Sequence, residues 1–150
     1  MNDLWGFSKL NKNHIKSMPH GILKAQADLF EKKTDNKLLI RTSTRNLSIK
    51  ADNKYGLGTN FQIIAPQLDG YSYTLFTMYS MPENDYPVAI TLNASKYNNI
   101  LPTFDYECTN ENEFLEALGE ILGSENTTRI VINLYSKSLV NDDDDDSLPF

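Results

Sequence analysis

The sequence predicts an α+β fold, in which an antiparallel sheet of about five strands is flanked by an N-terminal helix and one or two C-terminal helices. Three observations predict it: apolar residues recur at helical spacing near both ends of the chain, short β-branched and aromatic runs fill the middle, and turn residues separate those runs. With 150 residues, 40% of them hydrophobic, the chain can bury one core. We expect a single domain over residues 1–140 and a disordered tail over residues 141–150.

The helical patterns lie towards the two ends of the chain. A helix over residues 19–33 begins at a proline, which suits a first helical turn, and its apolar face is formed by Ile22, Leu23, Ala27, Leu29 and Phe30. Asn110 and Glu113 have the spacing of a capping pair, and they precede a second amphipathic helix that ends at Gly123. Residues 127–139 fit a helix by spacing and a strand by β-branched content, and we expect a helix.

The middle of the chain predicts five strands, over residues 37–42, 46–50, 61–65, 71–79 and 86–92. We expect Ser43-Thr44-Arg45 to turn between the first two strands, and residues 51–60, which contain two glycines, to form a mobile loop. Residues 93–110 are expected to be irregular. Pro87 lacks a backbone donor, which predicts an edge position or a bulge. An OB-like barrel is the alternative arrangement of five strands, although flanking helices fit it poorly.

The net charge of −6 is unevenly distributed. Residues 1–60 carry 11 lysines and arginines against 5 carboxylates, whereas residues 61–140 carry 3 against 10, and the tail adds five aspartates. The acidic isoelectric point of about 4.8 therefore does not argue against nucleic-acid binding, because the tail masks a basic first part. The alternative is that the lysines only solvate a helix and loops.

Several classes of protein are not expected. The one cysteine, Cys108, allows no internal disulfide and fits a reducing compartment, and no apolar run approaches the length of a membrane span. We therefore expect a cytoplasmic protein, which would be nucleoid-associated if it binds DNA. His14 and His20 lack a cysteine or an acidic pair at metal spacing, so neither a metal, a cofactor nor a catalytic residue is predicted. A small nuclease that uses acidic turn residues is a weaker alternative, with Asp69, Glu83 and Asp85 as its carboxylates.

Basic and aromatic residues in the strand region are the candidates for contacting a nucleic acid. Lysine and arginine would bind backbone phosphates, and tyrosine rings would stack on bases. The candidates are Arg41, Arg45, Lys50, Lys54, Tyr55, Tyr71 and Tyr73. On a regular strand, Tyr71 and Tyr73 share a face with Leu75 and Tyr79, and such a stripe also suits ordinary core packing.

The first 18 residues interleave aromatic and basic side chains. Trp5 and Phe7 are followed by Lys9, Lys12 and Lys16, which suits an arm that binds single strands. The same rings could instead pin this segment to the body, and we expect that packing role.

The tail begins with five carboxylates, Asp142, Asp143, Asp144, Asp145 and Asp146. They repel one another and have no apolar partner, so an extended, solvated segment is expected. Pro149 restricts Leu148 to extended conformations. The ring of Phe150 beside a terminal carboxylate suits an apolar pocket with an arginine or lysine at its rim, while the aspartates steer the tail to a basic surface.

This ending resembles the C-terminal acidic tip of bacterial single-stranded DNA-binding proteins (SSB). Leu148, Pro149 and Phe150 fit the last three positions of that tip, and the five aspartates fit its acidic run. Ser147 departs from the pattern, because the family usually runs from acid directly into the aliphatic residue. The resemblance covers about ten residues and does not extend to the body. It implies that the tip docks onto replication, recombination and repair proteins and competes with nucleic acid for the protein's own surface.

Two main hypotheses follow from these patterns. The first is a non-enzymatic single-stranded DNA-binding protein whose tip recruits DNA replication and repair proteins, encoded by a host, a mobile element or a phage. The second is an adaptor or decoy that mimics the tip to bind or inhibit host genome-maintenance enzymes without binding DNA. A homo-oligomer is compatible with either.

Overall fold

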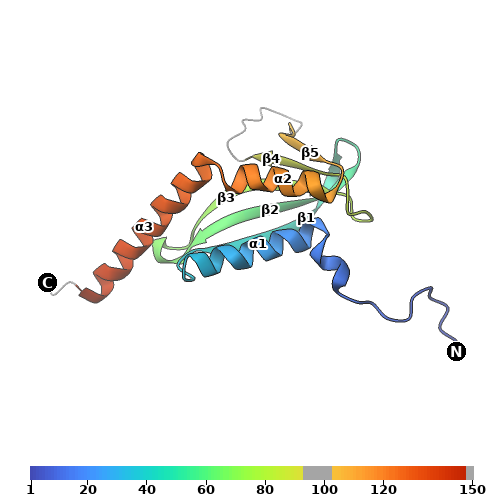
Figure 1. The fold of residues 1–150 in the computed structure, drawn as a ribbon, viewed down its shortest axis with the longest axis horizontal. Coiled ribbons are helices and arrows are strands. Elements are labelled where there is room, and N and C mark those ends of the chain that lie inside the picture. Colours follow the sequence, from blue (N-terminus) through green and yellow to red (C-terminus); the bar gives the residue numbers. More distant parts are fainter. Residues whose placement is uncertain (93–102, 148–150) are drawn as a thin grey trace.

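The computed structural model describes residues 1–92 and 103–147, and for residues 142–147 it describes the backbone alone. It confirms the predicted α+β fold: a five-stranded antiparallel sheet with one helix before it and two after it (Figure 1). The strands follow one another across the sheet in chain order, which makes it an open meander. Because the sheet is open, the alternative of an OB-like barrel is wrong.

The elements have the following bounds. The helices are η1 (Asn13–Lys16), α1 (Pro19–Lys33), η2 (Pro66–Leu68), α2 (Glu111–Leu122) and α3 (Glu125–Ser147). The strands are β1 (Leu39–Ala51), β2 (Tyr55–Ala65), β3 (Tyr71–Ser80), β4 (Val88–Leu92) and β5 (Tyr106–Cys108). β5 lies in a stretch that was expected to be irregular.

The core lies between one face of the sheet and the helices. α1 and α2 lie side by side across that face (Figure 1), and α3 adds Ile130, Val131 and Leu134 to the same core. Phe61 on β2 and its cross-strand partner Phe76 on β3 are buried there, with their rings stacked at 4.9 Å. Each fully buried side chain of this size contributes about 1.5–3 kcal/mol, so this face holds the fold together.

The first hairpin is longer than the sequence predicts. β1 runs without interruption from Leu39 to Ala51, so the predicted turn at Ser43-Thr44-Arg45 is wrong. The turn lies at Asp52 and Asn53, whose positive φ angles of 52° and 58° suit a tight hairpin. Most of the predicted mobile loop over residues 51–60 is therefore strand, and that prediction is also wrong.

A bulge in β3 separates two tyrosines that were expected to share a face. Gln62 pairs with Thr74 and Phe61 pairs with Phe76, so Leu75 is the extra residue on its strand. The bulge reverses the alternation of side chains beyond it. Tyr73 therefore faces the helices and Tyr79 faces the other way, and the predicted shared stripe is wrong.

Pro87 precedes the first residue of β4, which lies between β3 and β5. A proline is tolerated there because the ladder begins after it, so the predicted edge position or bulge is wrong.

The predicted helices are largely confirmed. α1 has the expected bounds, and the side chain of Asn110 caps α2 by accepting a hydrogen bond from the backbone N–H of Glu113 at 2.9 Å. The ambiguous stretch at residues 127–139 is helical, as expected.

α3 also continues through the five aspartates to Ser147, where an extended chain was expected. Each residue added to an existing helix gains a backbone hydrogen bond without a new nucleation cost, which favours this continuation. The domain boundary at residue 140 stays a prediction, and residues 148–150 lie outside the described part of the chain.

Candidate nucleic-acid interface

The sheet face opposite α1 and α2, which we call the open face, is predominantly polar. No helix of the described chain covers it (Figure 1). Cross-strand pairing places on it every second residue of the strands, among them Arg41, Ser43, Arg45, Asn60, Gln62, Thr74 and Thr77. An exposed polar face that carries arginines is the surface of this fold best suited to a polyanion.

Hydrogen bonds order part of the open face. The guanidinium of Arg41 donates to Oε1 of Gln62 at 3.3 and 3.2 Å, and Nε2 of Gln62 donates to Oγ1 of Thr74 at 2.9 Å. This chain crosses three strands and holds the Arg41 side chain along the surface. The remaining guanidinium N–H groups can donate to a phosphate.

Arg45 is exposed on the same face, four residues along β1 and therefore about 13 Å from Arg41. Its cross-strand partner is Gly58. A Cβ atom on Gly58 would stand 3.3 Å from the Leu47 side chain and 3.9 Å from the Arg45 guanidinium. The glycine therefore leaves room for both side chains to lie over the sheet.

The two predicted lysines lie at the end of the first hairpin, beyond the open face. Lys50 is exposed. The Lys54 ammonium lies 4.0 Å from an Asp52 carboxylate oxygen and 5.2 Å from the centre of the Tyr55 ring. An adjacent carboxylate weakens the attraction of Lys54 for a phosphate, so Lys54 is the weaker candidate.

Tyr55 cannot stack on a base, so its predicted role is wrong. Its side chain is fully buried, with Phe104 packed edge-on at 5.6 Å, and its hydroxyl donates to Glu107 at 3.4 Å. Burial, and then the charge of Glu107, raises the pKa of Tyr55 to about 12. Because residue 55 begins a strand and not a loop, its ring enters a small apolar cluster with Ala51 and Ala89.

The other two predicted tyrosines do not join the arginines. Tyr73 is half-buried against the core on the helix-covered side, so its ring shares no surface with the arginines, and its role in stacking stays a prediction. Tyr71 is 48% exposed, but it pairs with Ala65 and lies on that same side of the sheet. Of the predicted set, the structure brings together only Arg41 and Arg45 on one surface.

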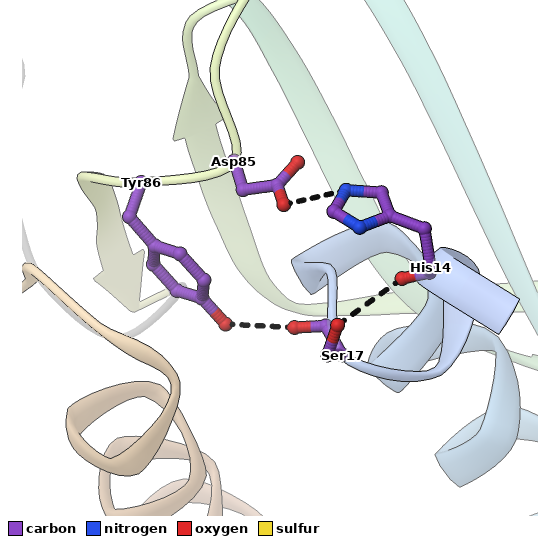
Figure 2. A network of polar contacts seen from close by, with 4 residues as sticks. All are labelled: His14, Ser17, Asp85 and Tyr86. Atoms are coloured by element: carbon purple, nitrogen blue, oxygen red, sulfur yellow. Dashed lines mark hydrogen bonds and ion pairs between the residues drawn. The ribbon is translucent and has the colours of Figure 1, made fainter.

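Two contacts that the sequence did not predict attach the N-terminal segment to the body. Nε2 of His14 lies 2.8 Å from a carboxylate oxygen of Asp85, and the Tyr86 hydroxyl donates to the Ser17 carbonyl at 3.3 Å (Figure 2). Burial raises the pKa of Tyr86 to about 12, so it stays a neutral donor. No motif links positions about 70 residues apart, and only the fold brings them together.

Close backbone packing holds the same segment to α1. A Cβ atom on Gly21 would stand 1.7 Å from the Ile15 carbonyl oxygen, so only glycine allows η1 to cross α1 there. Beyond η1 the chain leaves the body (Figure 1), and Trp5 and Phe7 are 76% and 50% exposed. The expectation that these rings pack onto the body is therefore wrong.

The described residues do not assemble a metal site. No group of three or more His, Cys, Asp or Glu side chains within the described ranges could hold a metal ion. Asp85 is engaged by His14, and Asp69 occupies a left-handed turn position. Burial raises the pKa of Cys108 to about 11, which keeps its thiol protonated.

α3 carries the acidic segment away from the sheet (Figure 1). The Asn141 side chain donates to the Gln67 carbonyl at 2.5 Å, and the helix continues from there to Ser147. Within the part of the chain that the structure describes, no helix has the length and apolar character needed to cross a membrane.

Known proteins do not extend this picture. Comparisons of the chain with protein-family models, with curated proteins and with solved structures found no match.

Proposed function

We propose that this chain is a non-enzymatic single-stranded DNA-binding protein that recruits replication, recombination and repair proteins through its acidic tail. One observation carries the proposal: Asp142–Asp146 lie at the end of α3, which projects from the body, and the sequence continues through Ser147 into Leu148, Pro149 and Phe150. An acidic run before an apolar, proline-stiffened tip has the chemistry of a docking peptide.

The tail would act in two stages. Five neighbouring carboxylates attract a basic surface over a distance, which raises the association rate and makes it sensitive to salt. The Phe150 ring then fills an apolar pocket, and in a chain that ends at Phe150 the terminal carboxylate pairs with a cation at the pocket's rim. Truncating the ring should weaken capture more than removing any single aspartate.

The open face supports the DNA half of the proposal. Arg41 and Arg45 lie exposed on one face of β1, and the polar side chains of Gln62 on β2 and Thr74 on β3 lie beside Arg41. Two arginines whose backbone positions lie about 13 Å apart along β1 can contact phosphates of one strand. A cytoplasmic, nucleoid-associated location follows from this proposal, and a homo-oligomer is compatible with it.

The DNA half is tested by titrating a labelled oligo-dT strand with the full chain and with a chain lacking residues 141–150. Binding is expected for both. If the tail competes for the basic surface, its removal tightens binding, most strongly at low ionic strength. Absence of binding at low salt for both chains rejects the DNA half.

The recruiting half is tested by capturing purified SSB-tip-binding repair enzymes on immobilised protein. Phe150→Ala should abolish capture. In a chain that ends at Phe150, one appended residue should weaken capture, because it converts the Phe150 carboxylate to a peptide carbonyl and moves the terminal carboxylate away from the ring. Ser147→Ala is the matched control within the same segment and should leave capture intact. Capture that is unchanged by Phe150→Ala rejects the recruiting half.

A second candidate function is an adaptor or decoy that presents the tip without binding DNA. The burial of Tyr55 and Tyr73 favours it, because Tyr55 is fully buried and Tyr73 is half-buried against the core, so neither of these rings is presented beside Arg41 and Arg45 for stacking. Capture of repair enzymes without oligo-dT binding would select this second function over the first.

A further inference from the structure

The N-terminal arm, residues 1–12, presents aromatic side chains to solvent. We infer that this arm, and not the sheet, supplies the rings that stack on the bases of single-stranded DNA. The inference rests on the proposed function and assigns its base-contacting element. Trp5 and Phe7 are the residues that would stack, and Lys9, Lys12 and Lys16 would contact the phosphates.

The two rings are available for stacking. Trp5 and Phe7 are 76% and 50% exposed, and their centres lie 5.9 Å apart with the ring planes tilted by 47°. They touch each other at an angle, so neither ring covers the whole face of the other. Each can therefore receive a base, and stacking tolerates any sequence because every base has a π face.

The arm is shaped and anchored. Carboxylate Oδ1 of Asp3 accepts a hydrogen bond from the backbone N–H of Trp5 at 3.0 Å, and Oδ1 of Asn11 accepts one from Asn13 at 3.0 Å. These local turns restrict the backbone on both sides of Lys9 and at Lys12. The contacts of His14 and Ser17 with the body then fix the direction in which the arm leaves it (Figure 2).

The charge of the segment suits a phosphate backbone. Residues 1–18 carry three lysines against the single carboxylate of Asp3, and all three lysines are exposed. Alternating rings and cations are what a single-strand site requires, because the rings hold bases while the cations hold phosphates. The open face offers arginines, but Tyr55 is fully buried, Tyr73 faces the helices, and Tyr79 packs against the cluster around Tyr55. The arm therefore supplies exposed rings that the sheet lacks.

The tryptophan fluorescence of this protein reports on contacts of Trp5 alone, because Trp5 is the only tryptophan in the chain. Oligo-dT added to the full-length protein should quench Trp5 fluorescence in step with the anisotropy change of a labelled strand. Trp5→Ala and Phe7→Ala should each weaken binding by roughly 5- to 150-fold, the range that loss of one stacked base implies. Lys9→Gln should lower the magnitude of the salt slope by about 0.7.

The matched controls are Leu4→Ala and Leu10→Ala, which remove exposed apolar side chains from the same arm. They should change oligo-dT affinity less than twofold. Far-UV circular dichroism should be unchanged in all these variants, since the arm lies outside the core. Deletion of residues 1–12 should weaken binding at least as much as the Trp5→Ala, Phe7→Ala double variant.

Three results would overturn the inference. If the wild type binds and the Trp5→Ala, Phe7→Ala double variant binds equally well, the inference alone fails and the proposed function stands. If Leu4→Ala and Leu10→Ala weaken binding as much as the ring variants, the arm docks by apolar contact, as it would onto a protein. If the wild type does not bind oligo-dT at all, the DNA half of the proposed function fails together with the inference.

Discussion

The carbonyl oxygen of Ile15 packs directly against the α-carbon of Gly21, at a place where a Cβ atom would stand only 1.7 Å away. Intrinsic propensity alone favours alanine over glycine inside a helix by about 1 kcal/mol. Here the neighbouring group is backbone, which cannot rotate aside. We therefore expect Gly21→Ala to displace η1 and to lower the free energy of unfolding by about 1–2 kcal/mol.

The same substitution should reverse its sign when the arm and η1 are absent. In a chain lacking residues 1–16, Gly21→Ala should stabilise α1 by about 0.5–1 kcal/mol, because only the propensity difference is left. Urea unfolding midpoints of the full-length and shortened chains, each with and without Gly21→Ala, measure both effects. A similar gain in the full-length and shortened chains would show that Ile15 does not restrict residue 21.

Arg41 and Arg45 should set the salt dependence of DNA binding if the open face contacts phosphates. Each lost phosphate contact to a single strand reduces the magnitude of the slope of log K against log salt by about 0.7. Replacing both by glutamine should therefore reduce it by about 1.4. Lys32→Gln, which removes an exposed positive charge from α1, is the matched control and should leave the slope unchanged. An equal change of slope in this control would rule out a specific role for the open face.

His20 should make the protein less stable in mild acid. Burial lowers the pKa of His20, with a smaller opposing effect from Asp85, and its Nε2 lies 3.2 Å from the Thr59 hydroxyl. The unfolded state therefore binds the proton more readily, with a pKa near its ordinary value of 6.5. The contribution of neutral His20 to the free energy of unfolding is therefore complete above pH 6.5 and is lost as the pH falls from there through the lower folded-state pKa.

Denaturant unfolding measured between pH 7.5 and 5 checks this expectation. His20→Gln should flatten the pH profile in that range. Glu113, whose pKa is lowered chiefly by the hydrogen bond from the Thr109 backbone N–H, acts at lower pH, below its ordinary value of 4.5. Glu113→Gln is therefore the control that should leave the profile above pH 5 unchanged. An identical slope for wild type and His20→Gln would contradict the assignment.

Asn110 should contribute a measurable cap to α2. Its side chain accepts a hydrogen bond from the Glu113 N–H, and the Glu113 carboxylate accepts one from the Thr109 N–H at 2.7 Å. Asn110→Ala should cost about 1 kcal/mol, which corresponds to about 2–4 °C in melting temperature for a chain of this size. Asn112→Ala removes an exposed asparagine two residues further along, in the first turn of α2, and should change the melting temperature by less than 1 °C. Equal shifts for both variants would mean that the cap is not the cause.

The sequence predicts the helices well and the first hairpin poorly, for physical reasons. The spacing of apolar residues predicts the helices, and a capping residue, Asn110, predicts the start of α2. In β1, Ser43, Thr44 and Arg45 resemble a turn because polar residues cluster there, yet these side chains are exposed on an edge strand. The real turn at Asp52 and Asn53 carries residues that tolerate positive φ, a signal that the glycines of β2 obscured.

The candidate interface was predictable only in part. Alternation along a strand places Arg41 and Arg45 together, and that inference needs no tertiary information. The face of Tyr73 depends on a bulge that no local pattern marks. The contact between His14 and Asp85 depends on the packing of η1 against the turn before β4, which sequence spacing cannot reveal.

The N-terminal arm and the far end of α3 leave the molecule at opposite poles (Figure 1). A DNA strand bound at the arm would not obstruct an enzyme docked at the end of α3, so the protein could bind both at the same time. The sheet and its helices would then serve as a spacer, setting how far a recruited catalyst stands from the nucleotides it is brought to.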